Sequence, residues 1–394
     1  MDEALVHHVR LPMRYGFDHP AKRRRTSESL LLRLTVDGVS GHGECAPRSY
    51  VTGETCASVL ARLRDVPLDG LYGTLRAEPA DQVLAALRRD GFTGTFGIDG
   101  GSNLVCLLEL AVVDWLGQRL GLGARQLLAP DAGEGPPALR ISQVLDLGTT
   151  VEEFLDSRGP FHFVKVKASD DIERDVATVG RLRAALPAGV PVMVDANMSW
   201  HPDRAADHVR RLTDAGVTWF EEPLAKGALD DLRELRLATG ARIMLDESVC
   251  SLADAEAAEA ADACDAFNIR VSKCGGLFAS MDIARFARSH GIAYQVGVQV
   301  AETGPLIAAG RHLAFCLPDA LTVESGQSDR YFPEPVVTPM PAVDRRANTI
   351  APPPGTGLGT ALNESAGNWA VLAHRAGPAG WQESPAAREK AGRP

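Results

Sequence analysis

The stretch FVKVK at residues 163–167 ends a strand-like apolar run with two lysines. Three further segments follow it at intervals of about one β/α unit, and each closes an apolar run with carboxylates: VMVDAN (192–197), WFEEP (219–223) and IMLDES (243–248). Charged side chains at the ends of buried strands are costly unless they bind something. The series therefore predicts a functional site built from Lys165, Lys167, Asp195, Glu221 and Asp246.

The four segments belong to a longer rhythm of apolar, strand-like runs. Eight runs alternate with mostly amphipathic helical stretches: LRISQVL (139–145), FHFVKVK (161–167), PVMVDAN (191–197), VTWFEEP (217–223), ARIMLDES (241–248), AFNIRVS (266–272), AYQVGVQ (293–299) and ALTVES (320–325). Such alternation favours an α/β fold, a TIM barrel of the (β/α)7β type, over an open doubly wound sheet. No glycine-rich phosphate fingerprint follows the first run, which disfavours nucleotide binding.

The segments on either side of the barrel have a different character. Residues 1–130 begin with alternating, strand-like segments and continue with helical periodicity, which predicts an α+β capping domain. A Pro/Gly-rich linker follows, and residues 131–350 are assigned to the barrel. Residues 351–394 are rich in Pro, Gly and Ala, and we expect them to return to the cap, with a disordered last part.

Composition limits the classes of partner. The formal net charge is −10, which argues against nucleic acid or an anionic membrane. No apolar stretch approaches the roughly 18 residues that span a bilayer. The seven cysteines form no paired motif and are typical of reduced thiols. We expect a cytoplasmic protein.

Residue parity tests whether the charged groups can share one site, since alternate side chains of a barrel strand point inward. Lys165 and Lys167 share a face with Phe163, and the carboxylates share theirs with Met193, Trp219 and Met244. All of the charged groups lie at carboxyl ends of strands, where barrel active sites form. The parity predicts that they converge.

Three carboxylates in one mouth repel one another unless a cation lies between them. Oxygen ligands favour Mg²⁺, with Mn²⁺ as an alternative. Two neighbouring lysines suggest a base, because one ammonium lowers the pKa of the other.

The motifs KVK, DAN, EEP, DES and NIRVSKCGG, in this order, resemble the enolase superfamily, specifically its muconate lactonizing enzyme-like subgroup. The resemblance covers nearly the whole chain and implies a homo-oligomeric enzyme that removes the proton α to a substrate carboxylate. It makes Asp195, Glu221 and Asp246 the metal ligands and Lys167 the acid/base, with Lys165 tuning its pKa. Groups that support the ligands would be Asn197, Glu222 and Glu247.

One departure from the subgroup concerns the sixth strand, where members usually carry a second catalytic lysine. Here the strand reads AFNIRVSKCGG. Parity points Arg270 into the barrel and Lys273 away from it, unless a bulge re-aims the lysine. Arginine remains protonated and cannot act as a base, but it can bind a carboxylate.

Other candidate substrate contacts lie near the barrel mouth and in the cap. The cap loops 17–25 and 50–53 correspond to specificity loops of relatives, and the basic run in the first would suit an anionic substrate. The candidates are Lys22, Arg25, Tyr50, Gln143, Asn268, Gln299, Glu302 and Glu324.

Three hypotheses follow from the choice between Arg270 and Lys273. With Arg270 in the site, we expect a Mg²⁺-dependent, single-base β-elimination or cycloisomerisation through an enediolate. With Lys273 in the site, we expect an amino-acid or dipeptide racemase or epimerase that uses two lysines. A third hypothesis is a non-catalytic binding relative, but the intact ligand set argues against it.

Overall fold

In the computed structural model of the protein, eight parallel strands form one curled sheet with the order β12-β11-β10-β9-β8-β7-β6-β5. The description covers residues 2–19, 22–133, 135–300, 302–377 and 380–387, without the side chains of residues 18, 19 and 22–24. The first and last strands meet where Ser142 N donates to Val323 O at 2.9 Å, which closes the barrel.

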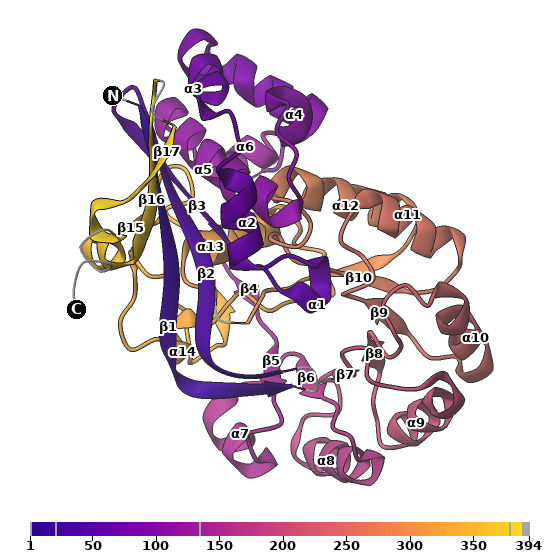
Figure 1. The fold of residues 1–394 in the computed structure, drawn as a ribbon. Coiled ribbons are helices and arrows are strands. Elements are labelled where there is room, and N and C mark those ends of the chain that lie inside the picture. The colour runs from indigo at the N-terminus through magenta and orange to yellow at the C-terminus, as the bar shows by residue number, and fades with distance from the viewer. Residues whose placement is uncertain (1, 20–21, 134, 301, 378–379, 388–394) are drawn as a thin grey trace.

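Within the described residues, seven helices connect the eight strands and surround the sheet (Figure 1). The barrel elements are β5 (Gln143–Leu145), α7 (Val151–Arg158), β6 (Val164–Lys167), α8 (Ile172–Ala185), β7 (Val192–Asp195), α9 (Pro202–Asp214), β8 (Trp219–Glu221), α10 (Leu229–Thr239), β9 (Ile243–Leu245), α11 (Leu252–Ala260), β10 (Ala266–Ile269), α12 (Leu277–Ser289), β11 (Ala293–Val296), α13 (Pro305–Cys316) and β12 (Thr322–Val323). The predicted (β/α)7β barrel is confirmed. The first run is shorter than predicted, because β4 (Leu139–Arg140) pairs with β14 (Thr349–Ile350) outside the barrel.

Parity along the strands separates two apolar layers. Phe163, Met193, Trp219 and Met244 pack together inside the barrel, in a cluster separate from the main core. Residues of the opposite parity, such as Val164, belong to the main core, which includes residues from the helices. The inward-facing apolar side chains therefore form the bottom of the site. The charged side chains that follow them along the strands lie above this apolar layer, at the carboxyl ends.

The cap combines both ends of the chain. Its antiparallel sheet has the order β17-β16-β1-β2-β3, so that two C-terminal strands extend the N-terminal sheet (Figure 1). The strands are β1 (Glu3–His19), β2 (Lys22–Val36), β3 (Val39–Cys45), β16 (Ala370–Arg375) and β17 (Trp381–Glu383). Helices α1 (Ser49–Thr52), α2 (Cys56–Leu63), α3 (Leu68–Ala77), α4 (Ala80–Phe96), α5 (Ser102–Leu120) and α6 (Ala124–Leu128) complete it. Shorter elements between the barrel and β16 are α14 (Ser328–Tyr331), β13 (Val337–Thr338), β15 (Ala361–Leu362) and the 3₁₀ helix η1 (Glu364–Trp369).

Strand β3 packs closely on helix α5, and glycine is needed for this contact. A Cβ atom on Gly43 would lie 2.1 Å from the carbonyl oxygen of Leu107. The close packing fixes α5 against the sheet, and this helix in turn contacts the barrel.

Buried carboxylates of the cap hold the barrel helices that follow the sixth and seventh strands. Glu109 of α5 accepts the amides of Leu277 (2.5 Å) and Phe278 (3.3 Å) at the start of α12. Glu44 of β3 accepts the amide and hydroxyl of Thr303 at 2.7 and 2.9 Å, just before α13. Because helix N-termini carry amides without intrahelical partners, these two contacts tie the cap to the catalytic end of the barrel.

Candidate active site

A cavity at the carboxyl ends of the strands contains most of the predicted site residues. Lys165, Lys167, Asp195 and Asp246 line it, whereas Glu221 lies just behind the lining and is fully buried. Adjacent strands place Lys167 opposite Asp195, and Asp195 opposite Glu221, in the β-ladder. The strand ends are thus level, which is why residues about one β/α unit apart in sequence converge.

The two lysines pair with the carboxylates. The Lys167 ammonium lies 2.5 Å from Asp195 Oδ2 and donates to Asn197 Oδ1 at 2.9 Å. The Lys165 ammonium lies 2.6 Å from Glu221 Oε2, 2.5 Å from Glu324 Oε1 and 3.9 Å from Asp195 Oδ2. The positive charges of the two β6 lysines therefore offset the carboxylates at the carboxyl ends of β7, β8 and β12.

These pairs decide the direction of the lysine pKa values. Burial lowers the pKa of Lys167, but Asp195 and Glu221 raise it by more, so the net pKa lies above the ordinary value although Lys165 lowers it. Burial also lowers the pKa of Lys165, and Glu221 and Glu324 overcome that effect. Lys165 thus lowers the pKa of Lys167, which is the expected direction, but the carboxylates of this arrangement outweigh the neighbouring ammonium.

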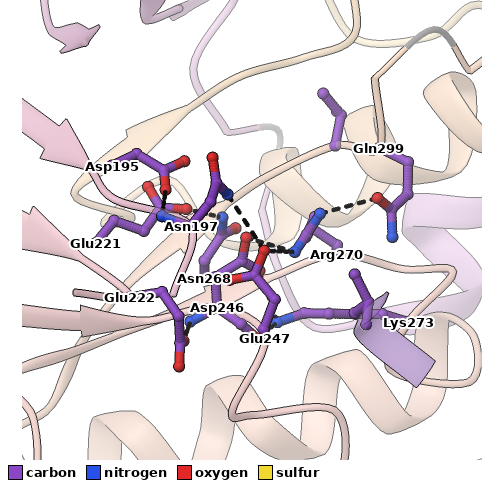
Figure 2. A network of polar contacts seen from close by, with 12 residues as sticks. Asp195, Asn197, Glu221, Glu222, Asp246, Glu247, Asn268, Arg270, Lys273 and Gln299 are labelled. Carbon is purple, nitrogen blue, oxygen red and sulfur yellow. Dashed lines mark hydrogen bonds and ion pairs between the residues drawn. The ribbon is translucent and has the colours of Figure 1, made fainter. Parts of the chain in front are cut away.

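The sixth strand resolves the competition between Arg270 and Lys273 for a place in the cavity. Arg270 lines it, and its guanidinium forms an ion pair with Asp246 and donates to Gln299 Oε1 at 2.8 Å. Lys273 is fully buried outside the lining and approaches Asp246 from the other side of the carboxylate (Figure 2). Its ammonium donates to Asp246 Oδ1 at 2.9 Å and to the carbonyl oxygen of the same residue. The orientation of both side chains agrees with the parity prediction.

Asp246 thus receives two cations in a buried position. Burial raises its pKa, but Arg270 and Lys273 lower it by more, and the net pKa lies well below the ordinary value. Asp246 is therefore a carboxylate at neutral pH, as a metal ligand would need to be.

The three supporting residues occupy different positions. Glu222 accepts the amides of Asp246 (2.6 Å) and Ser248 (3.2 Å) and orients the Asp246 segment. Asn197 contacts Lys167 directly and donates to Glu247 Oε1 at 3.3 Å. Glu247 was expected behind the ligands, but it lines the cavity, because the chain turns immediately after β9 and no longer alternates as a strand does.

The other barrel candidates also line the cavity, where most have protein partners. Asn268 donates to Glu221 Oε1 at 2.8 Å, and Glu324 accepts the amide of Val298 at 2.9 Å. Glu302 accepts the amide of Gln299 at 2.6 Å. Burial, and to a smaller extent the negative charge of Glu44, holds the pKa of Glu302 well above the ordinary value. The side-chain amide nitrogen of Gln143 is buried without a hydrogen bond in the described part of the chain.

The cap contributes some of the predicted residues to the cavity and not others. Tyr50 of α1 lines the cavity, but Arg25 is exposed and does not line it, and the side chain of Lys22 lies outside the described residues. Residues 17 and 22–24 are part of the β1–β2 hairpin rather than an irregular loop, with Phe17 paired to Arg24. The hairpin extends over the barrel mouth (Figure 1), where the Phe17 ring centroid lies 6.0 Å from Lys167 Nζ.

Several cavity residues were not predicted from the sequence. They are Val144, Arg158, Val298, Val300, Gly326, Gln327, Ser328 and Tyr331. Of these, Arg158 comes from the end of α7, and Gln327, Ser328 and Tyr331 come from the segment after β12. No motif marked them, because most reach the site from outside the strand ends on which the parity argument depends. Val144 lies within β5 but has the opposite parity to Gln143.

The donor set of the three carboxylates fits a hard divalent cation. All ligand atoms would be oxygens at adjacent strand ends. Burial, and to a smaller extent the negative charge of Asp195, raises the pKa of Glu221 to about 8. Glu221 Oε2 has no hydrogen bond of proper geometry among the described residues, despite the nearby Lys165 ammonium. A cation would compensate this buried negative charge.

A separate group of potential ligand atoms lies away from the cavity. His8, Glu28 and Cys56 are the one set of at least three His, Cys, Asp or Glu ligand atoms within 4.8 Å of one another in the described residues. Glu28 already pairs with Arg10 at 3.0 Å. The carboxylates of the cavity are spaced more widely, because the cationic side chains of the site lie among them.

The comparisons with known proteins agree with this geometry. The family model described as enolase C-terminal domain-like matches residues 146–366, more than half of the chain. The chain belongs to the enolase superfamily. A hydrophobic dipeptide epimerase from Citrifermentans bemidjiense is 31% identical to this chain, and the match covers 80% of this chain and 85% of the epimerase.

Solved structures show the same fold. The dipeptide epimerase from Cytophaga hutchinsonii, complexed with Mg and the dipeptide D-Ala-L-Val, has a TM-score of 0.79 and 22% identity, covering 92% of this chain and 96% of the other. The muconate lactonizing enzyme from Pseudomonas fluorescens, complexed with muconolactone, has a TM-score of 0.79 and 24% identity over 94% and 98%. The superfamily and subgroup indicated by the motifs are thereby confirmed. Among the described residues, no helix is both long and apolar enough to cross a membrane.

Proposed function

We propose that this enolase-superfamily enzyme uses Mg²⁺ and a single base, Lys167, to remove the proton α to a substrate carboxylate. The reaction would be a β-elimination or a cycloisomerisation, passing through an enediolate. The observation that carries the single-base reading is Arg270 in the cavity, where a second base would have to lie.

Strand order explains why position 270 matters. Lys167 ends β6 and Arg270 follows β10, four strands away in an eight-stranded barrel, so the two lie on opposite sides of the cavity. A proton removed from one face of the α carbon and returned to the other needs a base on each side. Arginine stays protonated and cannot accept that proton. Lys273 lies behind Asp246 and outside the cavity lining.

The remaining residues have consistent roles. Asp195, Glu221 and Asp246 would hold Mg²⁺, which when bound stabilises the negative charge that develops on the substrate carboxylate. Lys167 would accept the α proton at Nζ, and Asn197 positions that nitrogen through its 2.9 Å contact. Arg270 would donate to the carboxylate or to a leaving group, because its guanidinium keeps its charge throughout.

A second candidate is epimerisation, which the 31% identity to a hydrophobic dipeptide epimerase favours. It requires another base on the Arg270 side of the cavity. The two candidates make different predictions for the stereochemistry of exchange.

The test is α-proton exchange in D₂O with Mg²⁺, followed by NMR on a panel of 2-hydroxy acids, N-acyl amino acids and dipeptides. We expect exchange or product formation from one face only, reduced at least about 100-fold in Lys167→Ala. Arg181→Ala, which removes an exposed cation of α8 outside the cavity, is the control. Deuterated product of inverted configuration would overturn the single-base mechanism in favour of the epimerase.

Metal binding is measured separately from activity. Calorimetric titration with Mg²⁺ should show binding to the wild type and at least about tenfold weaker binding to Asp195→Asn and Glu221→Gln, since each removes an anionic ligand. Unchanged Mg²⁺ affinity in both variants would contradict the ligand assignment. A protein with neither Mg²⁺ binding nor exchange would support the non-catalytic alternative.

A further inference from the structure

Some of the buried hydrogen-bond donors of the cavity that lack protein partners among the described residues lie where the barrel closes. Gln143 Nε2 and Ser328 Oγ are buried, line the cavity and have no hydrogen bond among the described residues. Arg158 also lines the cavity, and its guanidinium makes no ion pair or hydrogen bond within the described part of the chain. Buried polar groups normally have partners, so this wall has the chemistry of a binding surface.

The three residues flank the closure of the barrel. Gln143 begins β5, Arg158 ends α7 directly after that strand, and Ser328 begins α14 just after β12. In the ring of eight strands, the junction of β12 and β5 lies opposite β8, whose neighbours also carry the candidate metal ligands. A substrate with its reacting carboxylate at the ligands therefore extends toward Arg158, with Lys167 and Arg270 on either side.

Among the described side chains, no carboxylate forms an ion pair with the positive charge of Arg158 on this wall. Burial lowers the pKa of Arg158, although Tyr331 and Asp146 raise it, and an arginine nevertheless remains protonated. Nearby carboxylates have other partners: Asp146 accepts the Thr149 hydroxyl at 2.6 Å, and Glu324 pairs with Lys165 at 2.5 Å. A half-buried cation without an ion pair favours an anion in the cavity.

We propose that Arg158, Gln143 and Ser328 form a subsite for a second carboxylate, so that the substrate carries a carboxylate at each end. This inference rests on the proposed function, because the reacting carboxylate defines the other end. The subsite disfavours a free dipeptide, whose ammonium would meet Arg158 with like charge and would find Glu324 already paired. All three groups can donate to one carboxylate, and the guanidinium can do so bidentately.

The test uses calorimetry with Mg²⁺ held constant. The probes are straight-chain dicarboxylates from glutarate to suberate and the monocarboxylates of equal length from pentanoate to octanoate. We expect one dicarboxylate to bind about 10- to 100-fold more tightly than its monocarboxylate, the range for a charge-assisted hydrogen bond. Arg158→Met should abolish this preference, and Ser328→Ala should reduce it about fivefold.

Arg181→Met, which removes an exposed arginine of α8, is the matched control and should keep the preference. Unchanged circular dichroism and Mg²⁺ affinity show that a variant is folded. The proposal is overturned if no chain length gives a preference, or if Arg158→Met retains it. If α-proton exchange depends on Lys167 but no dicarboxylate is preferred over its monocarboxylate, the subsite is refuted and the proposed function is not. A preference that depends on Arg158 in a protein without exchange supports the subsite and refutes the proposed function.

Discussion

Lys273→Met separates a structural lysine from a catalytic one. The Lys273 ammonium is fully buried and lies 2.9 Å from Asp246 Oδ1. At an effective dielectric of about 20, two unit charges at this distance attract by roughly 6 kcal/mol. Breaking one partner of a buried pair costs about 3 to 5 kcal/mol in practice. Methionine fills most of the volume and Arg270 still pairs with Asp246, so we expect a loss of about 3 to 5 kcal/mol in the free energy of unfolding.

The assay is urea unfolding at neutral pH in EDTA, followed by far-ultraviolet circular dichroism. Lys226→Met is the control, since this exposed lysine also donates to a backbone carbonyl, that of Val51 at 2.5 Å. It should change the unfolding free energy by no more than about 0.5 kcal/mol. A Lys273→Met protein as stable as the wild type, with exchange lost at one face of the α carbon, would show that Lys273 is a second base and refute the reasoning.

Three further predictions concern neighbouring residues. Arg270→Lys supplies a base opposite Lys167, and we expect α-deuterium exchange at both faces; exchange that remains single-faced by NMR would contradict the geometry. Burial raises the pKa of Glu109 from 4.5 to about 8 in the folded state. Between these two pH values its carboxyl is protonated in the folded protein and ionised in the unfolded chain. The free energy of unfolding should therefore fall as pH rises through this window. Urea titrations should show a shallower fall for Glu109→Gln than for the wild type, and an equal fall in both proteins would argue against the raised pKa of Glu109. Asn103 accepts the Ser272 hydroxyl at 2.7 Å and donates to Thr52 at 3.0 Å and Glu54 at 2.7 Å. Asn103→Ala should loosen the turn that carries Tyr50 and raise KM about fivefold with a smaller change in kcat, whereas an unchanged KM would show that Asn103 does not position the turn.

The fold and most of the site could be predicted because both depend on local periodicity. The period of two along each strand separates Phe163 and Lys165 from Val164, and it also points Arg270 into the barrel. Parallel strands bring their carboxyl ends to one edge, so Lys167, Asp195 and Asp246 converge whatever lies between them in the sequence. Parity still holds for the first residue after a strand, as at Asp246 and Arg270, but it fails one residue later, and Glu247 consequently lies in the cavity rather than behind it.

The sequence by itself determined the barrel, the order of the charged strand ends and the orientation of Arg270. Only the tertiary structure decided which charges pair. The pKa of Lys167 is raised because Asp195 and Glu221 come from neighbouring strands and outweigh Lys165. Lys273 reaches Asp246 across the turn after β10, and Arg158 reaches the cavity from the end of a helix. Electrostatic energies depend on distances of a few ångströms between separate elements, and strand periodicity carries no information about those distances.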